Sequence, residues 1–227
     1  MDKDQGIRYY SPEFFKFLRA LAKNNNRKWF QKNKSRYEKF VQTPSLRFIK
    51  DVSKELKAVN PYLVADPKPF GGSLFRIYRD LRFSKDKSPY KTNVAMEFWH
   101  RKGRKKSYTG LYLHLAPGHS FAGAGIWHQD ALTLTKVRRA IVSRPEAWRQ
   151  VKQAGLRIEG ESLKRPPTDF DPNHPYIADL KLKDLTAGVQ FTNAQVTGPR
   201  FMTDFVQTGN RLNPLNEFLA DALGMPW

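Results

Sequence analysis

The densest group of reactive side chains lies between residues 76 and 92. This segment holds six cationic side chains, two carboxylates and two phenols. The cations are Arg76, Arg79, Arg82, Lys85, Lys87 and Lys91. Guanidinium groups bind the oxygens of phosphate or carboxylate in pairs, and ammonium groups add a movable point charge. The composition therefore predicts an anion-binding site, and we assign these six residues to it.

The same segment holds candidates for proton transfer. Asp80 and Tyr90 could act as acid or base, and Asp86 could bond to the backbone of its own loop. A carboxylate among arginines has a lowered pKa, which favours a role in orienting the cations over a role as a base. The alternative is structural: ion pairs with Asp80, Asp86 or Glu97 would then tie the sheet to the helices.

His114 is the histidine best placed for acid-base catalysis, because imidazole titrates near neutral pH and this residue falls in a predicted strand. Tyr112 shares its face of that strand. In the next predicted strand, Gly123 and Gly125 have no side chains to place across from Tyr112 and His114. The glycines either leave a hollow beside the two rings or make room for Tyr112 in a packed sheet.

Several site classes lack their sequence signatures. The five histidines show no metal-ligand spacing, and the absence of cysteine excludes disulfides and thiolate chemistry. No phosphate-binding loop, dinucleotide fingerprint or Gly-x-Ser-x-Gly motif occurs. We therefore expect neither a metal nor a cofactor.

The charge balance indicates the chemistry of the partner. Forty Lys and Arg residues against 21 Asp and Glu give a formal charge of +19 and a pI near 10.1. Such a chain attracts polyanions, so we expect a phosphorylated small molecule or nucleic acid as the ligand. A basic turn at residues 101–106 and the mixture of aromatic and basic residues at 27–37 favour a nucleic-acid-binding groove. Stretches of this kind are more often solvated basic surfaces.

The chain begins with helical signals and then changes period. Capping residues, prolines and apolar spacing predict three helices between residues 11 and 60, with breaks at Asn24–Asn26 and at Thr43-Pro44. Alternation predicts strands at 74–83, 94–99, 111–115 and 121–127, with a hairpin at Pro117-Gly118. In the first of these strands, Arg76, Tyr78, Asp80 and Arg82 would share one face.

The C-terminal part returns to helix. Asp130 caps one predicted helix and Pro145 begins another, after which residues 164–175 form a proline-rich extended loop. A strand at 186–192 precedes helices at about 200–212 and 213–223. We therefore expect one α+β domain over residues 1–227, in which N-terminal and C-terminal helices pack on a central antiparallel sheet. The sequence shows no signal peptide or membrane span, so we expect a soluble, cytoplasmic protein.

The segment at 76–92 also resembles a known family. Its pattern is Arg76-x-x-Arg79-Asp80-x-Arg82-Phe83-x-x-Asp86-Lys87-x-x-Tyr90-Lys91-Thr92. This pattern, with landmarks at residues 10–18, 24–30, 112–118 and 123–127, resembles the DUF2461 family of bacteria and fungi. The resemblance implies that residues 76–92 are the defining segment of the family. It carries no activity, cofactor or catalytic residue with it.

Overall fold

A five-stranded antiparallel sheet forms the centre of the protein. The computed structural model describes residues 6–102 and 109–227, so most of the predicted basic turn at 101–106 lies outside the described residues. The strands are β1 (Leu63–Val64), β2 (Val94–His100), β3 (Gly110–Leu115), β4 (Ser120–Ile126) and β5 (Leu185–Phe191). Each strand pairs with the next along the chain. The predicted hairpin is confirmed, since Gly118 takes a φ of 76° between β3 and β4.

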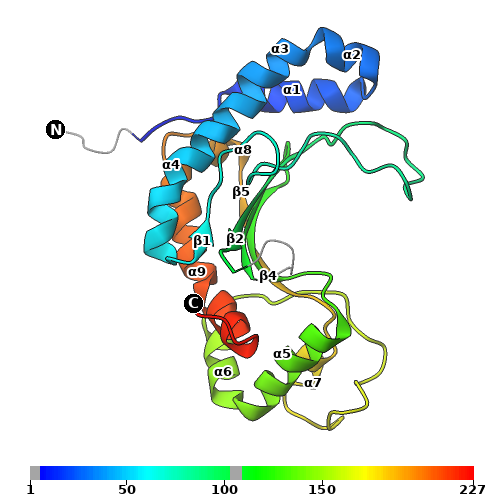
Figure 1. Ribbon diagram of the computed structural model, residues 1–227, viewed down its shortest axis with the longest axis vertical. Helices are drawn as coiled ribbons and strands as arrows, with labels where there is room; N and C mark the ends of the chain where they lie inside the picture. Colours follow the sequence, from blue (N-terminus) through cyan, green and yellow to red (C-terminus); the bar gives the residue numbers. More distant parts are fainter. Residues whose placement is uncertain (1–5, 103–108) are drawn as a thin grey trace, which may run out of the picture.

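Helices flank this sheet at both ends of the chain, which confirms the α+β prediction (Figure 1). The N-terminal helices are α1 (Pro12–Lys23), α2 (Arg27–Lys32), α3 (Lys34–Tyr37), the π-helix η1 (Glu38–Gln42) and α4 (Thr43–Val59). The later ones are α5 (Ala131–Ser143), α6 (Pro145–Gln153), α7 (Ile177–Leu180), α8 (Asn193–Val196) and α9 (Phe201–Ala222). None of the helices in the described part of the chain is long and apolar enough to cross a membrane.

Helices α4 and α9 cover one face of the sheet (Figure 1). The rings of Phe98 on β2 and Phe205 on α9 lie 5.3 Å apart, and both are buried. At Gly209 a Cβ atom would lie 3.0 Å from the Leu111 side chain, so glycine allows α9 to approach β3 closely. Phe98 and Leu111 thus point into this interface, and within the described residues no helical layer covers the opposite face of the sheet (Figure 1).

The predicted strand at 74–83 is wrong. Residues 74–92, which we call the arm, form only two isolated bridges, Leu74 with Met96 and Tyr78 with Tyr90. The Lys91 amide donates to the Ile77 carbonyl (2.7 Å), and the Arg79 amide donates to the Pro89 carbonyl (3.0 Å). The arm therefore folds back on itself and projects from the sheet (Figure 1). The alternation of residue types predicted a strand of the central sheet, but the backbone groups of this segment hydrogen-bond mainly with one another.

Two predicted helix breaks are also wrong. At Thr43-Pro44 the chain stays helical, because the π-helix η1 widens the turn just before Pro44. At Asn213-Pro214 helix α9 continues, with Pro214 inside it. Leu212, Leu215 and Leu219 are fully buried on either side, so packing outweighs the cost of the proline.

Candidate functional site

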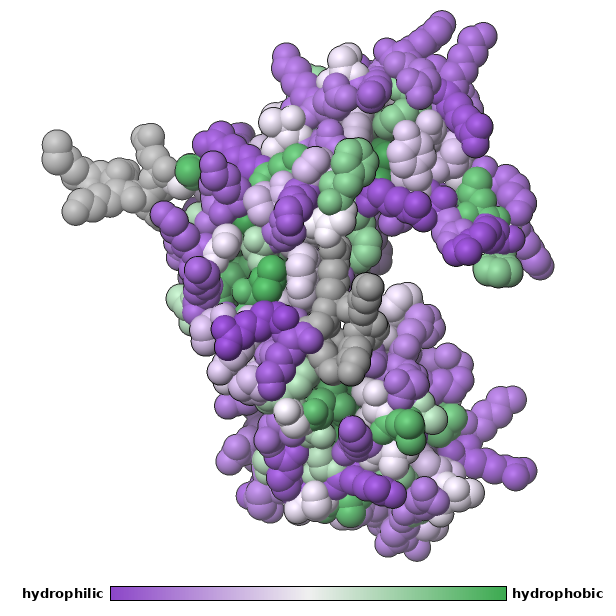
Figure 2. All heavy atoms as spheres, viewed as in Figure 1, coloured by the Kyte–Doolittle hydropathy of each residue, from purple (hydrophilic) through white to green (hydrophobic). Residues whose placement is uncertain are grey.

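The uncovered face of the sheet forms the floor of a groove with a volume of about 1030 Å³. Figure 2 shows the molecule hollowed between its upper and lower parts on the side where the arm projects. Four groups of side chains line the groove. They are the aromatic residues Phe75, Tyr112, Phe121 and Trp127, the histidines His114 and His119, the charged residues Arg79, Asp80, Lys91, Glu97, Arg157 and Glu159, and the amides Asn93, Gln129 and Gln190.

Glycines remove side chains from the middle of this floor. Tyr112 on β3 pairs with Gly123 on β4, and Gly123 pairs with Gly188 on β5. A Cβ atom at Gly123 or Gly188 would lie 3.7 or 3.8 Å from the Phe121 ring. The glycines thus leave a hollow beside Tyr112, as one of the two sequence interpretations predicts, and the ring that leans over them is Phe121.

Gly125 shapes the lower end of the floor. Its φ of 119° lies in the region that favours glycine, and a Cβ atom there would lie 2.0 Å from the Leu185 carbonyl oxygen. The Gly125 amide donates to Oδ1 of Asn216 on α9 (3.1 Å). The Asn216 amide also donates to the Gly110 carbonyl (3.0 Å), so one buried side chain holds the ends of β3 and β4.

His114 lies in a group of polar and aromatic side chains on the floor. Its Nδ1 is 3.3 Å from the Tyr112 hydroxyl and 3.5 Å from Nδ2 of Asn93. Its ring stacks on Phe121 at 5.0 Å with an interplanar angle of 13°. Burial, together with the nearby His119, lowers the pKa of His114 below its ordinary value. The imidazole is therefore neutral at neutral pH and can accept a proton or a hydrogen bond.

Tyr112 and Glu97 face each other across neighbouring strands. They are register partners of β3 and β2, and both line the groove. Burial and the Glu97 carboxylate raise the pKa of Tyr112. The phenol therefore keeps its proton over a wide pH range and acts as a hydrogen-bond donor or acceptor.

Two arginines of the arm have carboxylate partners. Arg82 bonds Asp80 through Nη2 at 2.6 Å, and hydrogen bonds from Arg82 lower the pKa of Asp80 to about 2. Arg79 pairs with Asp86, whose pKa is lowered to about 2 by hydrogen bonds from Ser88 and then by Arg79. Both carboxylates are ionised at neutral pH, which suits the orienting role predicted for Asp80 over the role of a base.

Lys91 differs from these arginines. Its ammonium group is half-buried, lies 5.2 Å from the centre of the Phe75 ring, and has no carboxylate partner among the described residues. Burial and the neighbouring Arg76 lower its pKa. The groove thus contains a partly desolvated cation whose charge no side chain of the described chain balances.

Tyr90 lies apart from the groove, in the aromatic core. Its ring is 2% exposed and stacks on Phe30 of α2 at 4.1 Å. Burial raises its pKa. This environment gives Tyr90 a packing role and leaves its hydroxyl away from the groove-lining residues.

The structure divides the predicted site residues into two groups. Arg79, Asp80, Lys91 and His114 line the groove. Arg76, Arg82, Lys85 and Lys87 are exposed on the arm outside it, and Nζ of Lys87 donates to the Leu81 carbonyl at 3.1 Å. The cations of the segment therefore do not all converge on one point.

Sequence analysis did not assign several groove residues. Phe121, Gln190 and Gly188 belong to strands whose groove-facing side is recognisable only after the strands are paired, and Asn93 directly precedes β2. The sequence did contain one signal for this face, the glycines at alternate positions of a strand. Such glycines leave the surface of a sheet open where glycines of neighbouring strands lie side by side.

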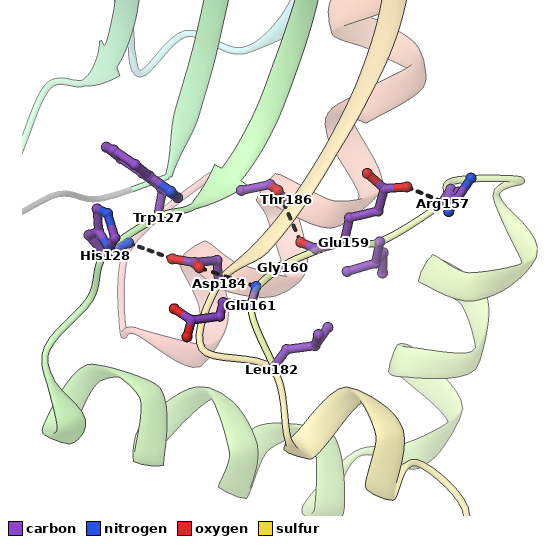
Figure 3. Close-up of a pocket in the computed structure, with 10 residues that line it drawn as sticks. Trp127, His128, Arg157, Glu159, Gly160, Glu161, Leu182, Asp184 and Thr186 are labelled. Atoms are coloured by element: carbon purple, nitrogen blue, oxygen red, sulfur yellow. Dashed lines mark hydrogen bonds and ion pairs between the residues drawn. The ribbon is translucent and has the colours of Figure 1, made fainter. Parts of the chain in front are cut away.

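A second cavity of about 820 Å³ adjoins the groove and shares Trp127, Arg157, Glu159 and Thr186 with it. Figure 3 shows that its polar side chains hold the loop at Glu159–Glu161 in place. The buried Asp184 accepts hydrogen bonds from the amides of His128 (2.7 Å) and Glu161 (3.4 Å). Arg157 pairs with Glu159 at 2.6 Å. These groups are engaged within the chain, which makes the groove the better candidate site.

The described residues contain no group of three His, Asp or Glu side chains that could hold a metal ion. Comparison with known families gives one assignment: the model for "Conserved hypothetical protein (DUF2461)" matches residues 13–218. The chain belongs to the DUF2461 family. The resemblance found in the sequence is thus confirmed. A comparison with curated proteins found no match.

Proposed function

We propose that the groove of this DUF2461 protein binds a ligand that carries an anionic group, phosphate or carboxylate, beside a planar ring. The observation that carries the proposal is the half-buried ammonium of Lys91, which has no carboxylate partner among the described residues and lines a groove whose floor has glycines in its middle. An anion at this position would offset the desolvation of Lys91 and its repulsion by Arg76.

The aromatic rings and glycines of the groove are the reason for proposing a planar group in the ligand. Phe121 and Tyr112 lie 5.9 Å apart over the glycines, so a flat group has both a ring to stack on and space to enter. Asn93 and Gln190 add amide groups that donate or accept hydrogen bonds. We retain the expectation that the protein works in the cytoplasm.

Phenyl phosphate combines a ring with an anion, so its binding tests the proposal directly. Isothermal titration should show that Lys91→Met weakens binding about tenfold or more, the expected loss for one charge-assisted hydrogen bond. Lys85→Met is the matched control, because Lys85 lies on the same arm outside the groove. Equal affinities for the two variants, or no binding by the parent protein, would refute the proposal.

A second candidate function, acid-base catalysis in the same groove, is favoured by His114. Its neutral imidazole contacts the Tyr112 hydroxyl, so it could accept a proton from a bound ligand. Catalysis by His114 would decline as pH falls through its lowered pKa. His114→Gln would abolish it while leaving the ligand bound.

A further inference from the structure

A strongly basic surface lies beside the groove. Residues 13–39 hold nine Lys and Arg side chains and two carboxylates. Both carboxylates already have partners, since Glu13 bonds Lys16 at 2.6 Å and Glu38 bonds Lys34 at 3.7 Å. The other cations of α1 and α2, Arg19, Lys23, Arg27, Lys28 and Lys32, are exposed. The upper part of the molecule therefore carries a large positive charge that it does not neutralise itself.

The arm is attached to these helices and extends the basic surface. The stacked rings of Phe30 and Tyr90 join α2 to the base of the arm. Figure 2 shows polar side chains over both the helices and the projecting arm above the hollow. Arg76, Lys85 and Lys91 of the arm have no carboxylate within ion-pair distance in the described parts of the chain. Their charges therefore add to that of the helices.

The arm also exposes an aromatic ring between its cations. Phe83 is 96% exposed, and the guanidinium of Arg82 lies 5.9 Å from the centre of its ring. Nothing within the described chain covers this ring. An exposed ring flanked by cations is the arrangement with which proteins stack on unpaired bases while holding the phosphates between them.

We propose that the basic surface and the groove together bind single-stranded nucleic acid. Phosphates would lie on the arm cations and on Lys91, and bases would stack on Phe83 and on Phe121 of the groove. The inference rests on the proposed function in one respect, since Lys91 receives one of the phosphates. It extends that function by naming the class of ligand and by including Phe83.

The shape and floor of the groove favour a single strand over other polyanions. The bases of a duplex are stacked within it and are not free to lie on Phe83 or Phe121. A flat bilayer would rest on the rim of the hollow in Figure 2 and would not enter the groove that Lys91 lines.

Fluorescence anisotropy with a labelled oligothymidylate of about 20 nucleotides tests the proposal on the full chain. Affinity should fall about fiftyfold between about 50 and 200 mM KCl, the dependence expected for about four phosphate contacts with a single strand. Phe83→Ala should weaken binding about tenfold without changing this salt dependence, because it removes stacking and no charge. Leu132→Ala is its matched control, since Leu132 is 78% exposed on α5 in the lower part of the molecule. Lys91→Met should weaken binding and lower the slope of log affinity against log salt by about 0.7.

The outcomes separate this inference from the function on which it rests. Equal effects of Phe83→Ala and Leu132→Ala, or equal affinity for duplex DNA or heparin, would overturn binding of a single strand. Binding of phosphatidylserine vesicles without binding of the oligonucleotide would assign the surface to membranes instead. If Lys91-dependent binding of phenyl phosphate survives without oligonucleotide binding, only the further inference fails. If oligonucleotide binding depends on Phe83 but Lys91→Met leaves both the affinity and its salt dependence unchanged, the anion site of the groove fails.

Discussion

The side-chain amide of Asn25 makes both hydrogen bonds to Tyr90 that a neighbouring strand would make. Its Nδ2 donates to the Tyr90 carbonyl at 2.9 Å, and its Oδ1 accepts from the Tyr90 amide at 3.1 Å. The side chain thus replaces a peptide group of a partner strand. Since Lys91 follows Tyr90 directly, this contact sets the position of the groove cation relative to the N-terminal helices.

Asn25→Ala should therefore loosen the base of the arm. We expect a loss of about 1–2 kcal/mol in the free energy of unfolding, because the partly buried amide and carbonyl of Tyr90 lose their partners. Chemical denaturation measures the loss. Asn24→Ala is the control, because the Asn24 side chain donates to the Ala20 carbonyl of α1 (2.9 Å) and not to the arm. Equal losses in the two variants would show that Asn25 does not anchor the arm.

Arg79→Ala separates local from global roles of the arm. Besides Asp86, the Arg79 guanidinium bonds Oγ of Ser84 (3.1 Å) and the Ser88 carbonyl (3.3 Å). All three partners lie within the same loop, so the substitution should speed amide hydrogen exchange at residues 84–88 and leave the core folded. Exchange measured by mass spectrometry tests this. Cooperative unfolding of the whole chain would instead support the structural interpretation of the segment.

The floor glycines should differ sharply in their tolerance of a side chain. At Gly125 both the positive φ and the 2.0 Å approach to Leu185 oppose a Cβ atom, so Gly125→Ala should cost about 3 kcal/mol or more. At Gly123 the Cβ atom would lie 3.3 Å from the Ala187 oxygen, so Gly123→Ala should cost about 1 kcal/mol. Thermal unfolding of the two variants measures the difference. Similar melting temperatures would contradict the assigned backbone geometry.

Much of the fold was predictable because local signals and tertiary packing agree. The strand at 94–99 is rich in apolar residues, that at 111–115 alternates apolar and polar residues, and both contribute buried residues to the core. Pro44 and Pro214 misled because proline usually ends a helix. Here the π-helix before Pro44 and the buried face of α9 around Pro214 offset the destabilisation that each proline causes. Neither feature has a local sequence signal.

The sequence did not predict how the charged residues of the candidate site are arranged. The density of cations pointed to the arm, yet Arg79 and Arg82 pair with carboxylates within it, and of the described Lys and Arg residues that line the groove only Lys91 has no carboxylate partner. The spacing of charges along the chain does not say which of them pair. The burial of Tyr90 was unpredictable for a related reason, since it depends on Phe30, which is distant in sequence.

The lowered pKa of His114 makes stability depend on pH in a defined direction. Below its ordinary value near 6.5 the unfolded chain takes up the proton more readily than the folded protein does, so the free energy of unfolding falls as pH drops toward the lower folded pKa. The His114→Gln variant lacks this titration. Between about pH 7 and pH 5 the melting temperature of the parent should therefore fall relative to that of the variant. The buried His100, whose pKa burial also lowers, is present in both proteins, so its contribution cancels. A difference that stays constant over this range would show that His114 titrates alike in the folded and unfolded states.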